Sequence, residues 1–163
     1  MKLFSGVYER TIDDKNRLPI PAPYRKILEF ELMEKPDRML DLKFCQHSQG
    51  FVWIECLVRS TLEQEIEQAR RSLVPRSEEW MIFWFGEIAK LERVRLDAQG
   101  RILIPQHYLE LARITKRCKI AGADTYFTIW APDQWELFQQ KMCTPEKVNA
   151  VLMKARGATA ERE

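Results

Sequence analysis

Short runs of apolar residues recur along the chain, several of them alternating with polar residues, and Gly, Asn, Ser and Pro separate them. Runs of this kind, bounded by turn-forming residues, are typical of β-strands. Two pairs of runs flank the turn-like segments 48–50 and 122–125, and each pair predicts a hairpin. The strands predicted from these runs are residues 4–12, 38–44, 51–54, 118–121 and 126–130.

Helices are predicted between these strands, where capping residues and prolines mark their starts. Pro21 and Pro23 precede a short helix over 24–28, because proline suits the first turn of a helix. Ser60, with Glu63 three residues later, predicts a helix with Ser60 as its N-cap that runs to about residue 72. The other predicted helices are 78–85, 106–112, a segment from Pro132, and a short helix after 144 that frays over 157–163.

The segment 80–85, Trp-Met-Ile-Phe-Trp-Phe, is the most apolar stretch of the chain. Ser77 is expected to cap this helix and Gly86 to form its C-cap. A helix that is apolar on all sides is usually buried, so its composition favours a core helix. A surface that binds a partner protein is the alternative interpretation.

One segment of the chain occurs twice, as residues 13–24 and again 84 positions later as residues 97–108. Chance would give about one identity in twelve positions. Such an internal repeat predicts two copies of one supersecondary unit, here hairpin–helix–hairpin–helix. The five identical positions are Asp13/Asp97, Arg17/Arg101, Ile20/Ile104, Pro21/Pro105 and Tyr24/Tyr108.

Each repeat contains a tight turn between two apolar runs, with three-residue loops at 14–16 and 98–100. Such loops usually need a left-handed backbone at their last position. Asn16 and Gly100 stand there, and both residue types tolerate that conformation. Opposed side chains in a hairpin lie on one face about 5 Å apart, so an acid and a base can pair. The pairs expected to close the turns are Asp13–Arg17 and Asp97–Arg101.

Charge is unevenly distributed, although the net charge of the 163 residues is only +2. Residues 1–28 carry a net charge of +3, residues 29–80 a net charge of −4 and residues 90–119 a net charge of +5. Basic patches of this kind attract nucleic acid or membrane surfaces. Ordinary fluctuation of charge along a chain is the alternative explanation.

The sequence contains few signals of metal binding, catalysis, membrane insertion or secretion. The four cysteines show no CxxC spacing, and Cys45 with His47 is a weak metal cue. No nucleophile–base arrangement is visible, no apolar run approaches 18 residues, and no signal peptide precedes residue 4. We therefore expect a protein of the cytoplasm that is not an enzyme, with no catalytic residue, cofactor, metal, membrane contact or small-molecule substrate.

The pattern (I/L)-D-x-x-(G/N)-R-(L/I)-x-I-P, present twice, resembles the MraZ family of bacterial transcriptional regulators. Phe4-Ser5-Gly6 and the segment from Thr115 to Trp135 are also similar to that family. The resemblance implies an α+β fold like the AbrB and SpoVT DNA-binding domains. Two tandem copies of the hairpin–helix–hairpin–helix unit would form a pseudo-twofold, swapped-hairpin β-barrel with peripheral helices. The implied divisions are a first repeat (1–76), a linking helix with the second repeat (77–144) and a C-terminal tail (145–163).

The resemblance further implies a ring-like homo-oligomer associated with the nucleoid. It would bind double-stranded DNA at repeated promoter boxes of the division and cell-wall gene cluster. Two departures from the family pattern are Asn16 in place of the usual glycine and Gln99 where the first copy has Lys15. An antitoxin-like or scaffold protein of the same fold, acting through its acidic middle or C-terminal half, is the alternative.

Two interpretations of the Asp–Arg pairs remain open. The pairs can be structural clamps, since an exposed ion pair contributes only about 0–1 kcal/mol. Alternatively, each arginine contacts phosphate or reads guanine while Asp13 or Asp97 orients it. The first turn is the more basic of the two, while Gln99 can hydrogen-bond a base edge. The expected DNA-contacting residues are Arg17, Lys15, Asn16, Arg10, Arg101, Gln99 and Arg95.

Overall fold

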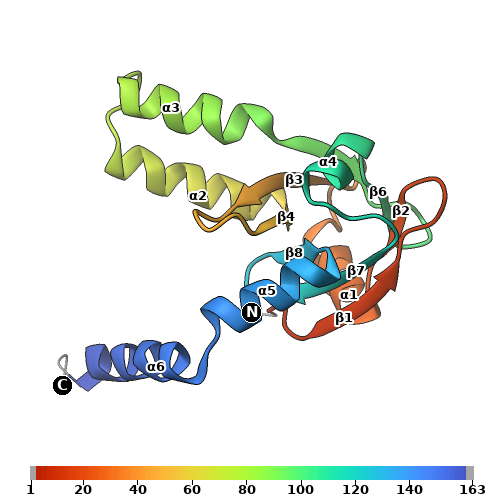
Figure 1. Ribbon diagram of the computed structural model, residues 1–163. Coiled ribbons are helices and arrows are strands. Elements are labelled where there is room, and N and C mark those ends of the chain that lie inside the picture. Colours follow the sequence, from red (N-terminus) through yellow and green to blue (C-terminus); the bar gives the residue numbers. More distant parts are fainter. Residues whose placement is uncertain (1–2, 161–163) are drawn as a thin grey trace.

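The computed structural model describes residues 3–160 and contains a six-stranded antiparallel sheet, a separate two-stranded ribbon and helices around them (Figure 1). The strands are β1 (Val7–Thr11), β2 (Arg17–Pro19), β3 (Met39–Gln46), β4 (Val52–Leu57), β5 (Glu92–Arg95), β6 (Arg101–Leu103), β7 (Arg117–Gly122) and β8 (Phe127–Trp130). The helices are α1 (Ala22–Glu31), α2 (Arg59–Ser72), α3 (Glu78–Gly86), α4 (Gln106–Leu111), α5 (Pro132–Met142) and α6 (Pro145–Ala160), with the 3₁₀ turn η1 (Ile88–Lys90) after α3. The predicted α+β class is confirmed.

Strands of the two repeats are interleaved in the sheet, whose order is β1-β7-β8-β4-β3-β5. The first repeat contributes β1, β3 and β4, and the second contributes β5, β7 and β8. β2 and β6 leave this sheet and pair with each other. The expected β-barrel is not closed, because β1 and β5 are the two edges of the six-stranded sheet and the β2–β6 ribbon forms a separate sheet.

The hairpins β3–β4 and β7–β8 are confirmed, but neither repeat turn is continued by a regular local hairpin, and only an isolated bridge between Leu96 and Ile102 extends the second. Backbone hydrogen bonds close the first turn from Asp13 N to Arg17 O (3.1 Å) and from Asn16 N to Asp13 O (3.0 Å), and the second from Asp97 N to Arg101 O (2.9 Å) and from Gly100 N to Asp97 O (3.1 Å). Beyond these bonds, β1 pairs with β7 and β5 with β3. The β2–β6 ribbon places Leu18 opposite Ile102, with both side chains fully buried, so core formation favours pairing between the repeats.

The residues shared by the two repeats explain this arrangement. Tyr24 donates its hydroxyl hydrogen bond to Gly6 O (2.7 Å), and Tyr108 donates to Lys90 O (2.9 Å), the position 84 residues further on. Pro21 and Pro105 occupy the N-cap positions of α1 and α4. The repeated apolar positions lie in one common core, and they are Ile12, Leu18, Ile20, Leu96, Ile102 and Ile104.

The starts of α2 and α3 have different causes. Ser60 is not the N-cap of α2, because the helix begins at Arg59 and the buried Val58 takes the N-cap position. The guanidinium of Arg59 binds the buried Asp41 carboxylate at 2.8 and 3.0 Å, which holds the first helical residue against β3. The Ser77 cap on α3 is confirmed, since its hydroxyl accepts a hydrogen bond from Trp80 N (3.2 Å).

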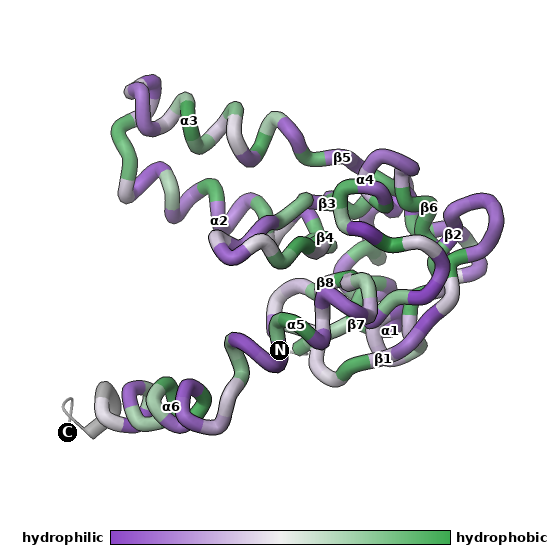
Figure 2. The backbone as a smooth tube through the Cα atoms, viewed as in Figure 1, coloured by the Kyte–Doolittle hydropathy of each residue, from purple (hydrophilic) through white to green (hydrophobic). Residues whose placement is uncertain are grey.

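The interpretation of α3 as a core helix is wrong. Its residues are all at least partly exposed, and Met81, Ile82 and Phe85 expose 50%, 65% and 60% of their surface. In Figure 1, α2 and α3 form a helical hairpin that projects from the sheet, and Figure 2 shows apolar positions along α3. Gly86 ends α3 as its last residue, so the expected glycine C-cap is also wrong and Glu87 holds that position with φ −121°.

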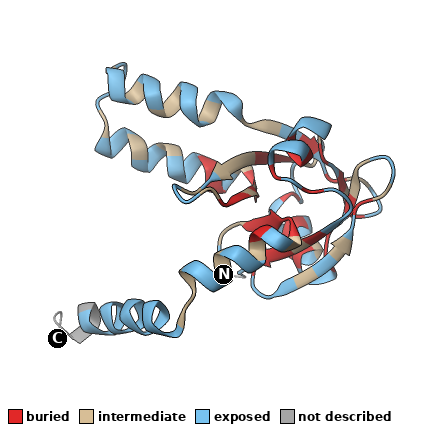
Figure 3. Ribbon diagram, in the orientation of Figure 1, coloured by how far each residue is buried: buried red, intermediate tan, exposed pale blue. Residues whose placement is uncertain are grey.

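The C-terminal helix α6 is longer than expected, since it continues through Gly157. Figure 3 shows it extending away from the buried core, with an exposed surface. Val151 and Met153 expose 67% and 72% of their surface. Between residues 3 and 160, no helix combines the length and apolarity needed to cross a membrane.

Candidate functional site

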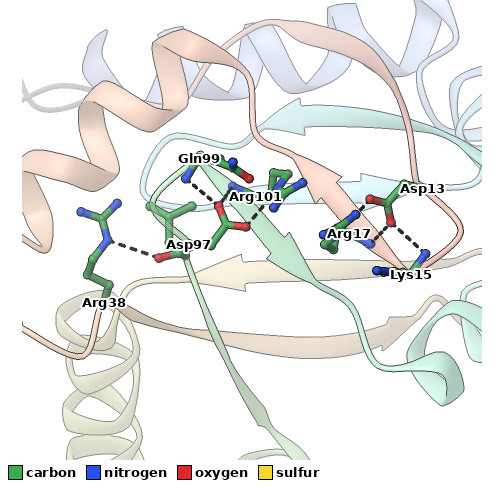
Figure 4. A network of polar contacts seen from close by, with 8 residues as sticks. Asp13, Lys15, Arg17, Arg38, Asp97, Gln99 and Arg101 are labelled. Carbon is green, nitrogen blue, oxygen red and sulfur yellow. Dashed lines mark hydrogen bonds and ion pairs between the residues drawn. The ribbon is translucent and has the colours of Figure 1, made fainter.

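The first repeat turn is organised by a single carboxylate. Asp13 Oδ1 accepts hydrogen bonds from the backbone N–H groups of Lys15 and Arg17, both at 2.9 Å. Asp13 Oδ2 accepts from Arg17 Nε at 2.7 Å (Figure 4). Asn16 has φ 62°, as the loop length predicts. The carboxylate therefore fixes both the turn and the direction of the arginine side chain.

The second repeat turn has the same geometry. Asp97 Oδ1 accepts from the N–H groups of Gln99 and Arg101, both at 2.9 Å, and Oδ2 accepts from Arg101 Nε, also at 2.9 Å (Figure 4). Gly100 has φ 74°. Both predicted closing pairs are confirmed, and each uses only the Nε edge of its guanidinium.

These contacts lower the pKa of both carboxyl groups below the usual 3.8. For Asp13 the main cause is the backbone N–H of Arg17. For Asp97, partial burial acts to raise the pKa, but the backbone and side-chain hydrogen bonds of Arg101 outweigh it. A lowered folded-state pKa stabilises the turn above the ordinary pKa, and this contribution is lost as the pH falls through the lowered value. Both carboxyl groups are therefore ionised at neutral pH.

The register of the β2–β6 ribbon brings the two arginines to one face. Arg17 lies opposite Leu103 and Arg101 lies opposite Pro19, while Leu18 and Ile102 point to the core on the other face. A groove of about 410 Å³ lies beside this outer face and joins both repeats. We call it the arginine groove, and its lining residues are Arg17, Arg93, Val94, Arg95, Asp97, Arg101, Leu103 and Pro105.

Arg93 of this groove is absent from the sequence-based set. Its neighbour Val94 is buried, so strand alternation places Arg93 and Arg95 together on the exposed face of β5. The sequence Arg-Val-Arg contains that signal. Arg93 also lies 3.9 Å from Asp37 and 3.8 Å from Asp41, which partly neutralise its charge.

The remaining predicted residues lie around the turns or apart from them. Lys15 and Gln99 are exposed at the turn tips. Asn16 Nδ2 donates to Gln106 Oε1 of α4 at 2.9 Å, which ties the first turn to the second repeat. Arg10 does not line the groove, because its Nη1 donates to Glu9 O (2.7 Å) and its guanidinium lies 5.5 Å from the centre of the Tyr8 ring.

The chemistry that these groups offer is anion binding. Within residues 3–160, no cluster of three or more His, Cys, Asp or Glu side chains is arranged to hold a metal. Burial raises the pKa of the Cys118 thiol to about 12, so this buried group is a neutral thiol at neutral pH. The arginine groove instead presents several guanidinium groups, which suit phosphate oxygens and guanine edges.

We expect Gly100→Ala to destabilise the fold more than Gly50→Ala, by about 1 kcal/mol. Both glycines have a positive φ (74° and 95°), so both substitutions strain the backbone by about 1–2 kcal/mol. A Cβ on Gly100 would in addition lie 2.2 Å from Cδ of Arg25, whereas one on Gly50 meets no atom within 4 Å. Urea unfolding of both variants measures the difference, and equal losses of stability would contradict a packed contact between Arg25 and the second turn.

Comparisons with known proteins agree with these features. A family model described as MraZ protein, antitoxin-like, matches residues 89–150. A protein of Roseiflexus sp. (strain RS-1) named transcriptional regulator MraZ is 35% identical over 137 residues, covering 82% of this chain and 85% of the relative. Relatives with the same name are 34% identical in Moorella thermoacetica over 139 residues (82% and 85%) and 31% identical in Dictyoglomus thermophilum over 152 residues (91% and 93%).

Proposed function

The chain belongs to the MraZ family, and from this membership we propose that it is a transcriptional regulator that binds double-stranded DNA in a sequence-specific manner. The observation that carries the proposal is the arginine groove, in which Arg17 and Arg101 of the two repeats share one face. The relatives named as transcriptional regulators support the class of function. Double-stranded DNA presents phosphates and base edges on a scale that a two-strand ribbon can follow.

The contacts of Arg17 and Arg101 leave part of each guanidinium group available to DNA. Each arginine donates a hydrogen bond from Nε to its aspartate. None of the Nη atoms of Arg17 and Arg101 has a hydrogen-bond partner within residues 3–160. Two parallel N–H groups remain available to a phosphate or to guanine O6 and N7. Asp13 and Asp97 orient the arginines, while Lys15, Gln99 and Arg95 add contacts beside them.

Pairing of strands between repeats supports the finer description of the fold as two AbrB-like swapped hairpins. In this description, residues 1–76 and 77–144 are the two repeats, and 145–163 is a C-terminal tail. The cross-repeat pairs β1–β7, β2–β6, β3–β5 and β4–β8 are the supporting observation. One consequence is that neither repeat would form the arginine groove without the other.

The proposal includes assembly into a homo-oligomer, a ring, that binds repeated boxes in a promoter. Exposed apolar side chains on α3 support it, because contiguous apolar surface of this kind marks an interaction site. A head-to-tail contact that closes on itself produces a ring. The regulator would act in the cytoplasm at the nucleoid, on promoter repeats of the division and cell-wall gene cluster.

We expect DNA binding with a steep salt dependence and a preference for spaced boxes over a single box. Each neutralised phosphate contributes about −0.9 to the slope of log K against log salt concentration. Linked subunits bind a second box at high effective concentration, so an array gains affinity without new contacts. Titration of fluorescent duplexes at two or more salt concentrations tests the proposal. Equal affinity for one box and for an array would contradict multivalent binding, and failure to bind any duplex at low salt would refute the proposed function.

An antitoxin-like or scaffold protein is the second candidate. A groove of about 470 Å³ on the helical hairpin α2–α3 favours it, since apolar and aromatic side chains form most of its lining. The lining residues are Arg70, Arg76, Trp80, Met81, Trp84 and Phe85. If this alternative holds, the purified chain binds a partner protein through α3 and shows no preference among DNA sequences.

A further inference from the structure

The two repeat turns differ in charge at equivalent positions. The first turn carries Lys15 at its tip, and the second carries the neutral Gln99. By sequence alone the first turn is therefore the stronger DNA-binding element. The structure changes this comparison, because each turn is contacted by a helix of the other repeat.

The second turn is covered by Arg25 of α1. A Cβ built on Gly100 would lie 2.2 Å from Arg25 Cδ, 3.0 Å from Nη1 and 3.2 Å from Nε, so the side chain lies directly on the glycine. Gly100 is buried as a result, while Arg25 is half-buried. Glycine at this position thus makes room for a cation from the other repeat.

The guanidinium of Arg25 is not neutralised where it lies. Its Nε atom is buried and has no hydrogen-bond partner in the described part of the chain, and Arg25 forms no ion pair there. A buried N–H without an acceptor is costly, and a guanidinium without a counter-ion attracts an anion. Because Nε itself is buried, a phosphate oxygen would bind at the Nη groups of this guanidinium.

The first turn receives a neutral group instead. Gln106 of α4, from the second repeat, accepts a hydrogen bond from Asn16 and donates to Glu110 (3.3 Å). The first turn therefore combines its own lysine with a neutral glutamine from the other repeat. The second turn combines its own glutamine with an arginine from the other repeat. In addition to the arginines of the groove, the first turn then carries Lys15 and the second is covered by Arg25.

We propose that Arg25 is a phosphate-binding residue of the second turn and supplies the cation that Gln99 does not. This inference rests on the proposed DNA-binding function and extends the site to α1. It makes the two turns comparable in charge, so that DNA is held at both ends of the β2–β6 ribbon. The ligand is the phosphate backbone of duplex DNA rather than a base edge.

Arg25→Gln tests the proposal, with Lys26→Gln as the matched control. Lys26 is the next residue, loses the same charge, and lines a hollow beside Leu3, Ala22 and Ile27, away from the turn. We expect Arg25→Gln to weaken duplex binding about tenfold and to reduce the salt slope by about 0.9 for each bound turn, while Lys26→Gln has little effect. Fluorescence titration of the full chain at several salt concentrations measures both quantities, and circular dichroism melting reports folding.

A rescue experiment separates a charge role from a packing role. The double variant Arg25→Gln/Gln99→Lys returns a cation to the second turn, so we expect it to recover affinity and salt slope. A folded double variant that stays as weak as Arg25→Gln would overturn the proposal, as would equal losses in Arg25→Gln and Lys26→Gln. If Arg17→Ala loses binding and Arg25→Gln does not, the proposed function stands and this inference fails. A wild-type chain that binds no duplex overturns both.

Discussion

Arg17→Ala is expected to remove most DNA affinity while the fold and the assembly persist. Each lost base or bidentate phosphate contact costs about 1–3 kcal/mol, and several subunits bound to one array multiply that loss. Stability should change little, since an exposed Asp–Arg pair contributes about 0–1 kcal/mol. Binding titrations with a duplex array, together with circular dichroism and light scattering, measure the three properties separately.

Two further variants make this test specific. Arg71→Ala removes the same charge from the exposed end of α2, away from the groove, and we expect it to bind DNA normally. Arg17→Lys retains the charge but not the paired N–H groups, so partial recovery indicates a phosphate contact and no recovery a guanine contact. Unchanged DNA binding by a folded Arg17→Ala variant would favour the clamp interpretation and move the DNA surface elsewhere.

The double substitution Ile82→Glu/Phe85→Glu is expected to dissociate the proposed homo-oligomer. These side chains are 65% and 60% exposed in the single chain, so the fold does not depend on them. Burying such a side chain at an interface contributes about 1.5–3 kcal/mol, and two losses weaken association about 10²- to 10⁴-fold. Light scattering at micromolar concentrations should therefore give a mass near 19.4 kDa for the variant and several times that for the wild type.

Met33→Glu is the control for this assembly prediction. Met33 is 72% exposed in the turn after α1, so its substitution adds a charge to an apolar surface residue remote in sequence from α3. We expect this variant to assemble normally. A wild-type chain that stays at 19.4 kDa would refute the assembly, and a double variant that keeps the wild-type mass would show that α3 is not the interface.

Features determined by neighbouring residues could be predicted from the sequence. The Asp–Arg turns, the left-handed Asn16 and Gly100 and the hairpin β3–β4 all follow from local spacing. The pairing of β2 with β6 could not, because adjacent strands favour a local hairpin and only the shared core selects the partner 84 residues away. The exposure of α3 could not be predicted either, because an apolar composition is typical of core helices and of interface helices.

The candidate site shows the same division. Arg17 and Arg101 could be found because the repeat marks them, and Arg93 could have been found from strand alternation beside Arg95. Arg25 could not, since it lies on a helix of one repeat and meets the other repeat only in three dimensions. The place of Arg10 outside the groove could not be predicted either, because charge alone does not reveal that its guanidinium contacts the Tyr8 ring and Glu9 O.

Site-specific photo-crosslinking to duplex DNA tests the central claim, that DNA binds at the two repeat turns, most directly. A photoreactive amino acid is placed singly at Lys15, at Gln99, or at Gln49 in the β3–β4 turn, which serves as the control position. The account predicts DNA crosslinks from Lys15 and Gln99 that disappear at high salt, and none from Gln49. DNA that crosslinks from Gln49 and from neither repeat turn, in a chain that binds duplex, would contradict the account.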